Sequence, residues 1–231
     1  MFPGPLGNSL AGKGLAKKDW NLYVVDIRDF STLKHQKVDD TPFGGGNGLI
    51  MRPDVIDAAL IRAAKNHKNP KFIYFSPRGI PLTQVKINQI LDGHSFTDPP
   101  LRQDDMDFEF VLLCGRYEGV DQRVIDHWQM EEISIGDYIL SGGELAALVF
   151  IDTLVRKMTL KNQETLKTES FEVELLEYPQ YTVPREFHNL HVPQVLFSGH
   201  HKDIERWRHE QSVQLTKSRR PDLWARYLRK Q

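Results

Sequence analysis

The sequence predicts an α/β fold with a mostly parallel sheet, followed by a small helical domain. Short apolar runs rich in β-branched and aromatic residues alternate with helix-like segments through residues 22–157. One of these runs, residues 108–114 (FEFVLLC), is apolar almost throughout, which is typical of a strand buried on both faces. After a polar stretch that begins at Met158, the pattern is helical to the C-terminus. We therefore expect an α/β domain, a linker and a helical domain, in that order.

Each element of the α/β domain is predicted by its own local pattern. The predicted strands are residues 22–27 (LYVVDI), 71–75 (KFIYF), 108–114 and 131–135 (EEISI). The predicted helices, in which apolar residues recur at helical spacing, are residues 52–66, 120–128 and 144–157. Three loops follow predicted strands: SPRG after residue 75, GRYEG after residue 114 and GDYILSGG after residue 135.

The composition is that of an ordinary globular protein, with 231 residues, 40% apolar and 26% charged. The net charge is −1, so the protein as a whole does not attract a nucleic acid or a membrane, and only a local basic patch could bind one. The single cysteine, Cys114, excludes an internal disulfide and a cysteine-cluster metal site. The N-terminus has no signal-peptide pattern, and the longest apolar run, LAALVFI, is too short to span a bilayer. We therefore expect a cytoplasmic protein without a membrane partner.

The C-terminal part is basic and helical. Residues 158–170 are polar without an apolar period, which favours a mobile linker. Residues 201–231 hold nine Lys or Arg against four acids, with Trp207, Trp224 and Tyr227 interleaved, whereas residues 131–152 hold five acids and no Lys or Arg. This pattern is typical of a nucleic-acid surface. A solvated helical face with aromatic side chains packed beneath it explains the pattern equally well.

Several apparent motifs carry little weight. GNSLAGKG, residues 7–14, has the spacing of a phosphate loop through Gly12 and Lys13, but Gly14 stands where a Ser or Thr belongs. A nucleotide hydrolase built on this stretch is therefore a rival hypothesis with little support. No G-x-G-x-x-G fingerprint is present, and the histidine pairs His188/His191 and His200/His201 have no further ligand nearby. FGGGNG, residues 43–48, predicts only a flexible loop.

The three loops after strands predict one ligand pocket. In open α/β sheets such loops gather at the carboxyl edge, where ligands bind. These loops are rich in glycine and poor in reactive side chains, which suits a ligand such as adenine that is recognised through backbone groups. Tyr117 and Tyr138 would form walls, and Glu118 could face a positive centre. Ordinary turn chemistry explains the same glycines, and both interpretations stay open.

The stretch LSGGE, residues 140–144, has the spacing of a capping box. Ser141 would be the N-cap residue, and the Glu144 side chain would accept a hydrogen bond from the backbone N–H of Ser141. Gly142 and Gly143 would then lie in the first turn, where each costs the helix up to about 1 kcal/mol relative to alanine. If the pocket exists, these glycines let a ligand approach the bare backbone at a helix N-terminus.

Long motifs resemble one family across almost the whole chain, from about Phe2 to Asp222. LLCGRYEGVDQRV, SIGDYILSGGELAAL, DDTPFGGGNGLIMRP and VLFSGHHKDIERWR are similar to the bacterial tRNA (guanine-N1)-methyltransferases, TrmD, of the SPOUT class. The resemblance implies S-adenosylmethionine as methyl donor and N1 of the guanosine just 3′ of the anticodon in tRNA as target. It also implies a trefoil knot in the N-terminal domain, a homodimer whose active site forms between subunits, and assistance by Mg2+, which Glu118 would support.

The resemblance also implies boundaries and site residues. It places a SPOUT cofactor-binding domain at residues 1–157, a linker at 158–172 and a helical tRNA-binding domain at 173–231. Arg156 would assist catalysis, and Glu169 would be the general base. The cofactor-binding residues carried over are Tyr74, Phe75, Ser76, Pro77, Gly115, Tyr117, Glu118, Ile135, Gly136, Asp137, Tyr138, Ile139, Leu140, Gly142 and Gly143. On composition alone, Arg156 would only place a favourable positive charge near the C-terminus of a helix, and Glu169 would be one more charge in the linker.

The sequence departs from the family pattern at three places. Glu169 stands where the family has an aspartate, which leaves a catalytically impaired RNA-binding protein of the same fold as the alternative function. The family opens with an apolar strand before the segment matching FPGPLG, so either the start lies upstream or the sheet lacks a strand. The segment 91–107 is longer than expected, and no role is assigned to it.

Overall fold

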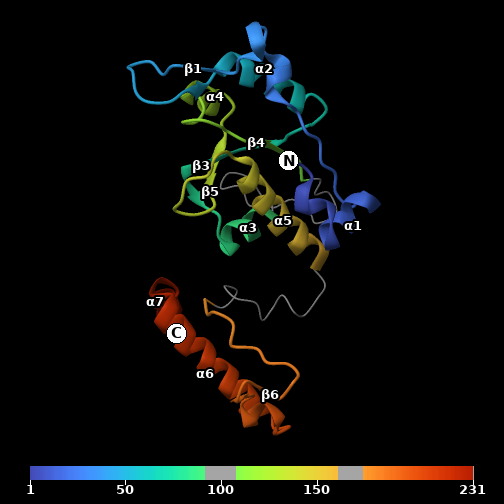
Figure 1. The fold of residues 1–231 in the computed structure, drawn as a ribbon, viewed down its shortest axis with the longest axis vertical. Helices are drawn as coiled ribbons and strands as arrows, with labels where there is room; N and C mark the ends of the chain where they lie inside the picture. The colour runs from blue at the N-terminus through green and yellow to red at the C-terminus, as the bar shows by residue number, and fades with distance from the viewer. Residues whose placement is uncertain (92–107, 161–173, 231) are drawn as a thin grey trace. The chain divides into compact units, whose positions relative to one another are not determined.

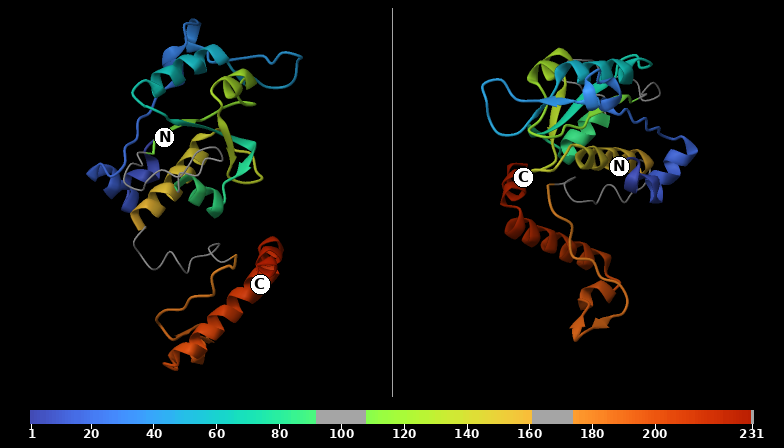
Figure 2. Two further views of the ribbon diagram at one scale, coloured as in Figure 1. Left: turned by 180° about the vertical axis from the view of Figure 1, so that it is seen from behind. Right: turned by 45° about the horizontal axis from the view of Figure 1, so that its top comes forward.

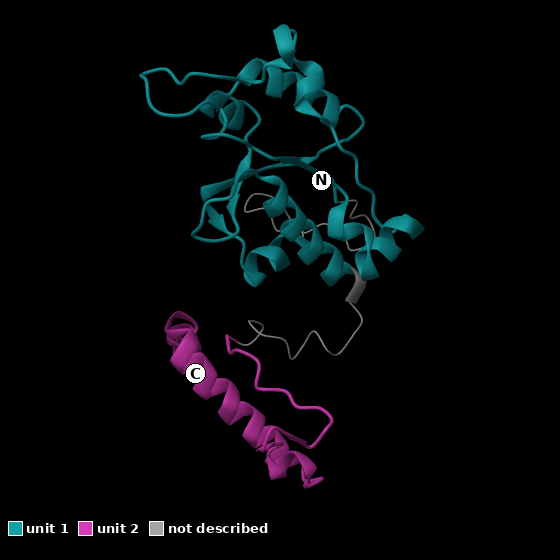
Figure 3. Ribbon diagram, viewed as in Figure 1, with its two compact units in different colours: residues 1–159 teal, residues 160–231 magenta. Residues whose placement is uncertain are grey.

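The computed structural model describes residues 1–91, 108–160 and 174–230. The chain divides into two compact units, Met1–Thr159 and Leu160–Gln231 (Figure 3). Within the described residues, no helix combines the length and the apolar character needed to cross a membrane.

A three-stranded parallel sheet forms the centre of the first unit (Figure 1). Its strands are β3 (Lys71–Pro81), β4 (Phe110–Leu113) and β5 (Glu131–Ser134), in the order β4-β3-β5. The register places Ile73 opposite Leu112 on one side and Glu131 on the other. The mostly parallel sheet and these three strands are as predicted. Because all three run in the same direction, the loops after them lie at one edge.

Helices cover both faces of this sheet (Figures 1 and 2). Tyr74 packs with apolar residues of α2 and α4 on one face, whereas Ile73 and Phe75 pack with α3 and α5 on the other. This alternation along β3 shows why the strand is apolar at successive positions: each face has its own core. The bounds of the covering helices are α2 (Pro53–Ala64), α3 (Gln84–Leu91), α4 (Gln122–His127) and α5 (Glu144–Leu160).

The stretch resembling a phosphate loop is helical. After a short 3-10 helix, η1 (Gly4–Gly7), helix α1 (Ser9–Lys17) includes Gly12 and Gly14, and no strand precedes it. A β-carbon on Gly12 would lie 2.3 Å from the carbonyl oxygen of Gly7, so this glycine permits a close approach of backbone to backbone. Leu6 and Ala11 pack against α5. The geometry contradicts the nucleotide-hydrolase hypothesis, because a helix presents no loop of amides to a phosphate.

The prediction of a strand at residues 22–27 is wrong. Residues 21–26 have no regular secondary structure, and a 3-10 helix, η2 (Ile27–Phe30), follows them. Tyr23 is 80% exposed. Of the described segments, none pairs with this run, and an apolar β-branched sequence becomes a strand only beside a neighbour that takes its backbone hydrogen bonds.

A small hairpin flanks the glycine-rich loop. Strands β1 (Asp39–Asp40) and β2 (Ile50–Met51) pair antiparallel, after the 3-10 helix η3 (Lys34–Gln36), and residues 41–49 connect them. β2 also forms a parallel bridge from Met51 to Val120, just after the loop that follows β4. The hairpin is therefore attached to the carboxyl edge of the sheet.

The second unit is mainly helical, as predicted. Its elements are β6 (Glu186–Phe187), β7 (Leu190–His191), η6 (Gln194–Phe197), α6 (His201–Arg219) and α7 (Pro221–Arg229). Pro221 opens α7 at its first turn, where the missing N–H costs nothing. Leu223 of α7 and Thr216 of α6 are buried.

Contacts with α6 and α7 hold the first described residues of the second unit in place. The buried carboxylate of Glu174 lies 2.9 Å from Nζ of Lys230 and 3.9 Å from a guanidinium nitrogen of Arg226. Two residues later, the N–H of Leu176 donates to Oγ1 of Thr216 at 2.8 Å. The segment that follows the predicted linker is thus held on both α6 and α7. Helix α5 extends to Leu160, so the predicted linker overlaps its end, and residues 161–173 of that linker lie outside the described residues.

Candidate functional site

The first loop at the carboxyl edge interrupts β3. Phe75 and Ile80 both lie opposite Ile133 of β5, so residues 76–79 leave the ladder between them. Sequence predicts a loop after Phe75, and the structure refines it to an excursion within a longer strand. Nε of Arg78 in this loop donates to the Glu132 carboxylate at 2.8 Å, which ties the loop to β5.

The second loop, residues 114–121, is packed onto a buried tyrosine. A β-carbon on Gly115 would lie 2.9 Å from the ring of Tyr74, and one on Gly119 would lie 3.3 Å from the same tyrosine's hydroxyl. Burial raises the pKa of the Tyr74 phenol, so it stays neutral near pH 7. Tyr117 has a left-handed φ of +57° and an exposed side chain.

The third loop, residues 135–143, makes a tight turn at its start. The N–H of Gly136 donates to Oγ of Ser134 at 3.2 Å, and Gly136 has φ +148°. A β-carbon there would lie 2.4 Å from the ring of Tyr138, so only glycine fits beneath that ring. Tyr138 and Ile139 are exposed beside this turn.

Direct contacts join the second and third loops. The N–H of Gly143 donates to the carbonyl oxygen of Gly115 at 2.9 Å. The Arg116 guanidinium donates twice to one carboxylate oxygen of Glu144, at 2.9 and 2.6 Å. Together with the Arg78 contact, these bonds gather the three loops at one edge, as predicted. Sequence reasoning missed Arg78 and Arg116, because neither spacing nor composition reveals their partners.

The capping-box prediction at residues 140–144 is wrong. Helix α5 begins at Glu144, and the carbonyl oxygen of Gly143 accepts its first hydrogen bond, from the N–H of Ala147. Ser141 therefore lies too early to cap, and the Glu144 carboxylate is bound by Arg116 instead of capping back. A tertiary ion pair has replaced the local motif.

Packing requires the second of the two glycines before α5, Gly143, whereas Gly142 faces only the side chains of Arg116 and Glu144. A β-carbon on Gly143 would lie 2.9 Å from Cα of Cys114, and one on Gly142 would lie 2.7 Å from the Arg116 side chain. The neighbouring loop thus fills the space on the side where a β-carbon of Gly143 would lie, and the approach of a ligand to this backbone stays a prediction. The close approach of backbone to backbone sets the geometry of the shared edge.

Replacing Gly143 with valine is expected to lower the free energy of unfolding by about 1–3 kcal/mol, because overpacking against immobile main-chain atoms forces the loops apart. Urea unfolding measures this loss. Gly7→Ala is the matched control, since its β-carbon would come no closer than 3.4 Å to Pro3. Wild-type stability for Gly143→Val would contradict the proposed packing role.

The glycine-rich stretch also has a partner that the sequence did not reveal. A β-carbon on Gly48 would lie 2.3 Å from the Glu118 side chain, and the N–H of Glu118 donates to the carbonyl oxygen of Leu49 at 3.0 Å. The N–H of Met51 donates to the carbonyl oxygen of Gly119 at 2.9 Å. The second loop is thus held between the hairpin and the start of α5.

Titratable groups at this edge favour binding over nucleophilic chemistry. Burial, with a smaller effect of the Glu144 charge, raises the pKa of the Cys114 thiol to about 12, so it stays protonated at neutral pH. Of the side chains that the structure describes, no three His, Cys, Asp or Glu gather to hold a metal ion. Main-chain groups, two exposed tyrosine rings and the ion pairs Arg78–Glu132 and Arg116–Glu144 are the features of this edge.

The structure brings together one part of the predicted site. Residues 74–77, 115–118 and 135–143 meet at the edge, although the side chains of Tyr74 and Phe75 are buried in the two cores. Arg156 is exposed on α5, 12 residues beyond Glu144, which places it about 18 Å along the helix axis from that edge. Glu169 lies outside the described residues.

Comparisons with known proteins cover both units. The family described as tRNA (Guanine-1)-methyltransferase TrmD matches residues 1–226 of this chain. A Rhodospirillum rubrum protein named tRNA (guanine-N(1)-)-methyltransferase is 50% identical over 230 residues, which are 99% of this chain and 90% of that protein. Proteins of the same name from Brucella ovis and Brucella melitensis biotype 1 are each 48% identical, over 98% of this chain and 88% of their own.

Proposed function

This chain belongs to the tRNA (guanine-1)-methyltransferase TrmD family, and we propose that its three loops bind S-adenosylmethionine for methyl transfer to tRNA. The enzyme methylates N1 of guanine in tRNA, and we place the target at the guanosine just 3′ of the anticodon. The observation that carries the proposal is the gathering of the loops at the carboxyl edge: Arg116–Glu144 and Gly143–Gly115 join the second and third loops, and Arg78–Glu132 ties the first loop to β5. The 48–50% identical relatives support an enzyme over the catalytically impaired alternative.

The edge suits an adenosine-like ligand. Tyr117 and Tyr138 are 56% and 54% exposed, and they flank glycine-rich backbone whose N–H and C=O groups can recognise a base. When bound, S-adenosylmethionine supplies a methyl group activated by a positively charged sulfur. The parallel order β4-β3-β5, with its loops at one edge, is consistent with the knotted SPOUT arrangement, which we propose for this unit.

The reaction requires a base and a positive charge. N1 of neutral guanine carries a proton, so its removal is needed for methyl transfer, and negative charge then develops towards O6. We propose that the Glu169 carboxylate accepts the proton and that the Arg156 guanidinium stabilises the charge at O6. Much of the rate enhancement would come from holding the methyl donor and the guanine in the correct relative position.

The position of Arg156 supports a site shared between two subunits. An arginine about 18 Å along α5 from the loop edge cannot reach a base held at that edge of its own chain, since an extended arginine side chain is much shorter. A second copy of the chain would bring its Arg156 to the first chain's loops. We therefore propose a homodimer in which each site combines cofactor loops of one subunit with Arg156 of the other.

A Mg2+ ion has weaker support. Glu118 is placed in the second loop beside Gly48, but no cluster of ligating side chains surrounds it among the described residues. If Mg2+ binds, Glu118 would supply a single carboxylate ligand, with water and substrate providing the others, as is usual for this ion. The single cysteine and the tRNA substrate support work in the cytoplasm.

Methylation of a tRNA transcript tests the function directly. We expect wild-type protein with S-adenosylmethionine to form N1-methylguanosine in a tRNA that has guanosine 3′ of the anticodon. A transcript with adenosine at that position should remain unmodified, because adenine has no N1 proton and no O6. Modification of both transcripts, or of neither, would contradict the proposed target.

A further inference from the structure

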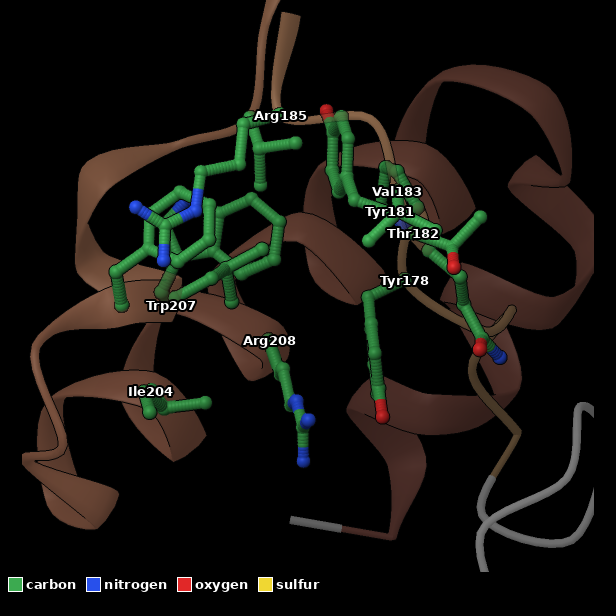
Figure 4. A pocket seen from close by; sticks show the side chains of 13 residues that line it. Tyr178, Tyr181, Thr182, Val183, Arg185, Ile204, Trp207 and Arg208 are labelled. Atoms are coloured by element: carbon green, nitrogen blue, oxygen red, sulfur yellow. The ribbon is translucent and has the colours of Figure 1, made fainter.

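The second unit contains a hollow of about 450 Å3, which none of the three loops lines (Figure 4). Its volume lies within the range of small-ligand sites. The extended segment before β6, the η6 turn and one face of α6 contribute its walls. The side chains that matter for its chemistry are Tyr178, Tyr181, Arg185, Phe197, Trp207 and Arg208.

Aromatic rings and guanidinium groups alternate around this hollow. The Arg208 guanidinium carbon lies 4.9 Å from the Tyr178 ring centroid, and Figure 4 shows the two side chains extending side by side. The guanidinium carbon of Arg185 lies 4.6 Å from the Phe197 ring centroid. Tyr181 and Trp207 form a tilted pair, with centroids 6.2 Å apart and planes at 54°. The result is a set of flat faces with positive charge beside them.

The arginines of the hollow differ from their neighbours in their partners. Arg206, two residues before Arg208 on α6, pairs with Asp203, and Arg220 pairs with Asp222. Within the described part of the chain, no acidic side chain forms an ion pair with Arg185 or Arg208. Their charges are compensated by ring faces alone, which leaves their N–H groups available to an anionic ligand.

Much of the aromatic surface remains exposed. Tyr181 is 48% and Phe197 is 49% exposed. Rings that served only as a core would be covered by apolar neighbours. Exposed rings beside cations form the combination that proteins use for unpaired nucleotides, in which the base stacks on a ring and the phosphate meets an arginine.

We propose that this hollow binds one unpaired, unstacked nucleobase of the tRNA, separate from the guanine that is methylated. The base stacks against the exposed ring of Tyr181, which Trp207 supports from beside it, and Arg185 and Arg208 contact the adjoining phosphates. The inference rests on the proposed function, since it takes tRNA as the substrate. It adds a second point of recognition, which would fix the RNA while the target base is in the catalytic site.

The test uses the full chain and a set of anticodon stem-loop RNAs, each lacking one base of the unpaired loop. We expect one abasic RNA, other than that lacking the target base, to bind wild type about tenfold more weakly, or about 1.4 kcal/mol. With Tyr181→Leu, the ring that the base contacts is gone. The affinities of this variant for the same abasic RNA and for intact RNA should therefore differ by less than about twofold. Tyr23→Leu, in the first unit, is the matched control and should behave as wild type.

A second variant provides an independent test in case Tyr181→Leu fails to fold. Arg208→Gln removes charge without removing apolar volume, and it should weaken binding of every RNA and reduce the salt slope by about 1. Two results would each show that the hollow holds no base. One is that removing any base lowers the affinity of wild type and of Tyr181→Leu by the same factor. The other is that the affinity of Arg208→Gln depends on salt concentration as steeply as that of wild type. Methylation of intact tRNA by wild type decides the proposed function separately.

Discussion

Replacing Glu169 with glutamine is expected to slow methyl transfer by about 10²–10⁴-fold, the usual contribution of a positioned general base. Glutamine keeps the length and shape of the side chain but cannot accept the N1 proton. Single-turnover reactions with excess enzyme and saturating S-adenosylmethionine measure the chemical step without product release. Calorimetric affinity for the donor should be unchanged, because the three loops that we propose as its binding site lie elsewhere in the chain.

Two further substitutions make this result specific. Glu164→Gln removes a carboxylate from the same linker and should leave the rate unchanged. Glu169→Asp restores the family's residue and should retain far more activity than Glu169→Gln, since a carboxylate remains within reach of the base. Full activity of Glu169→Gln would exclude Glu169 as the base.

The sheet and its loops could be predicted because their signals are local. Residues 72–75 and 110–114 are apolar at successive positions, and the structure packs them between two helical layers. Each run ends in glycine-rich sequence, so the approximate position of each loop was also visible. The site's framework therefore follows from short stretches of sequence combined with the rule that parallel strands end at one edge.

The errors arise where distant residues override a local pattern. Ser141 and Glu144 have capping-box spacing, but Arg116, 28 residues earlier, binds the carboxylate. The run at 22–27 has strand-forming residues but lacks a paired neighbour among the described strands. In both cases the outcome depends on a tertiary partner, which a single sequence does not identify.

Part of the basic C-terminal segment is packed and ion-paired, as one of the two interpretations left open by the sequence expects, and the nucleic-acid surface stays a prediction. Trp224 and Tyr227 stack on each other with centroids 5.5 Å apart, as expected for aromatic side chains packed on a helical face. Asp222 pairs with Arg220 and Arg226, and the hydrogen bond from Arg220 holds the pKa of that carboxyl below its usual range. Arg185 and Arg208 instead contact aromatic rings, so only part of the positive charge is neutralised by neighbouring acids.

Arg156→Ala is expected to lower the single-turnover rate by about 10²–10³-fold, as removal of one group that stabilises developing negative charge does in other enzymes. Affinity for S-adenosylmethionine should be unchanged, because the proposed partner of Arg156 is O6 of the guanine and not the methyl donor. Arg156→Lys should retain an intermediate rate, since the charge remains but the paired donors are lost. Arg62→Ala, at an exposed position on α2, is the control for loss of an arginine.

Mixing two impaired variants decides which subunit supplies the arginine. Gly143→Val disturbs the loops but leaves Arg156 intact, whereas Arg156→Ala leaves the loops intact. If each site combines loops of one subunit with Arg156 of the other, a mixed dimer has one fully intact site, and an equal mixture should recover about a quarter of the wild-type rate. If both parts came from the same chain, every site would carry one lesion and no activity would return. Size-exclusion chromatography of the mixture, with differently tagged chains, verifies that mixed dimers form, so that absence of recovery would count against a shared site.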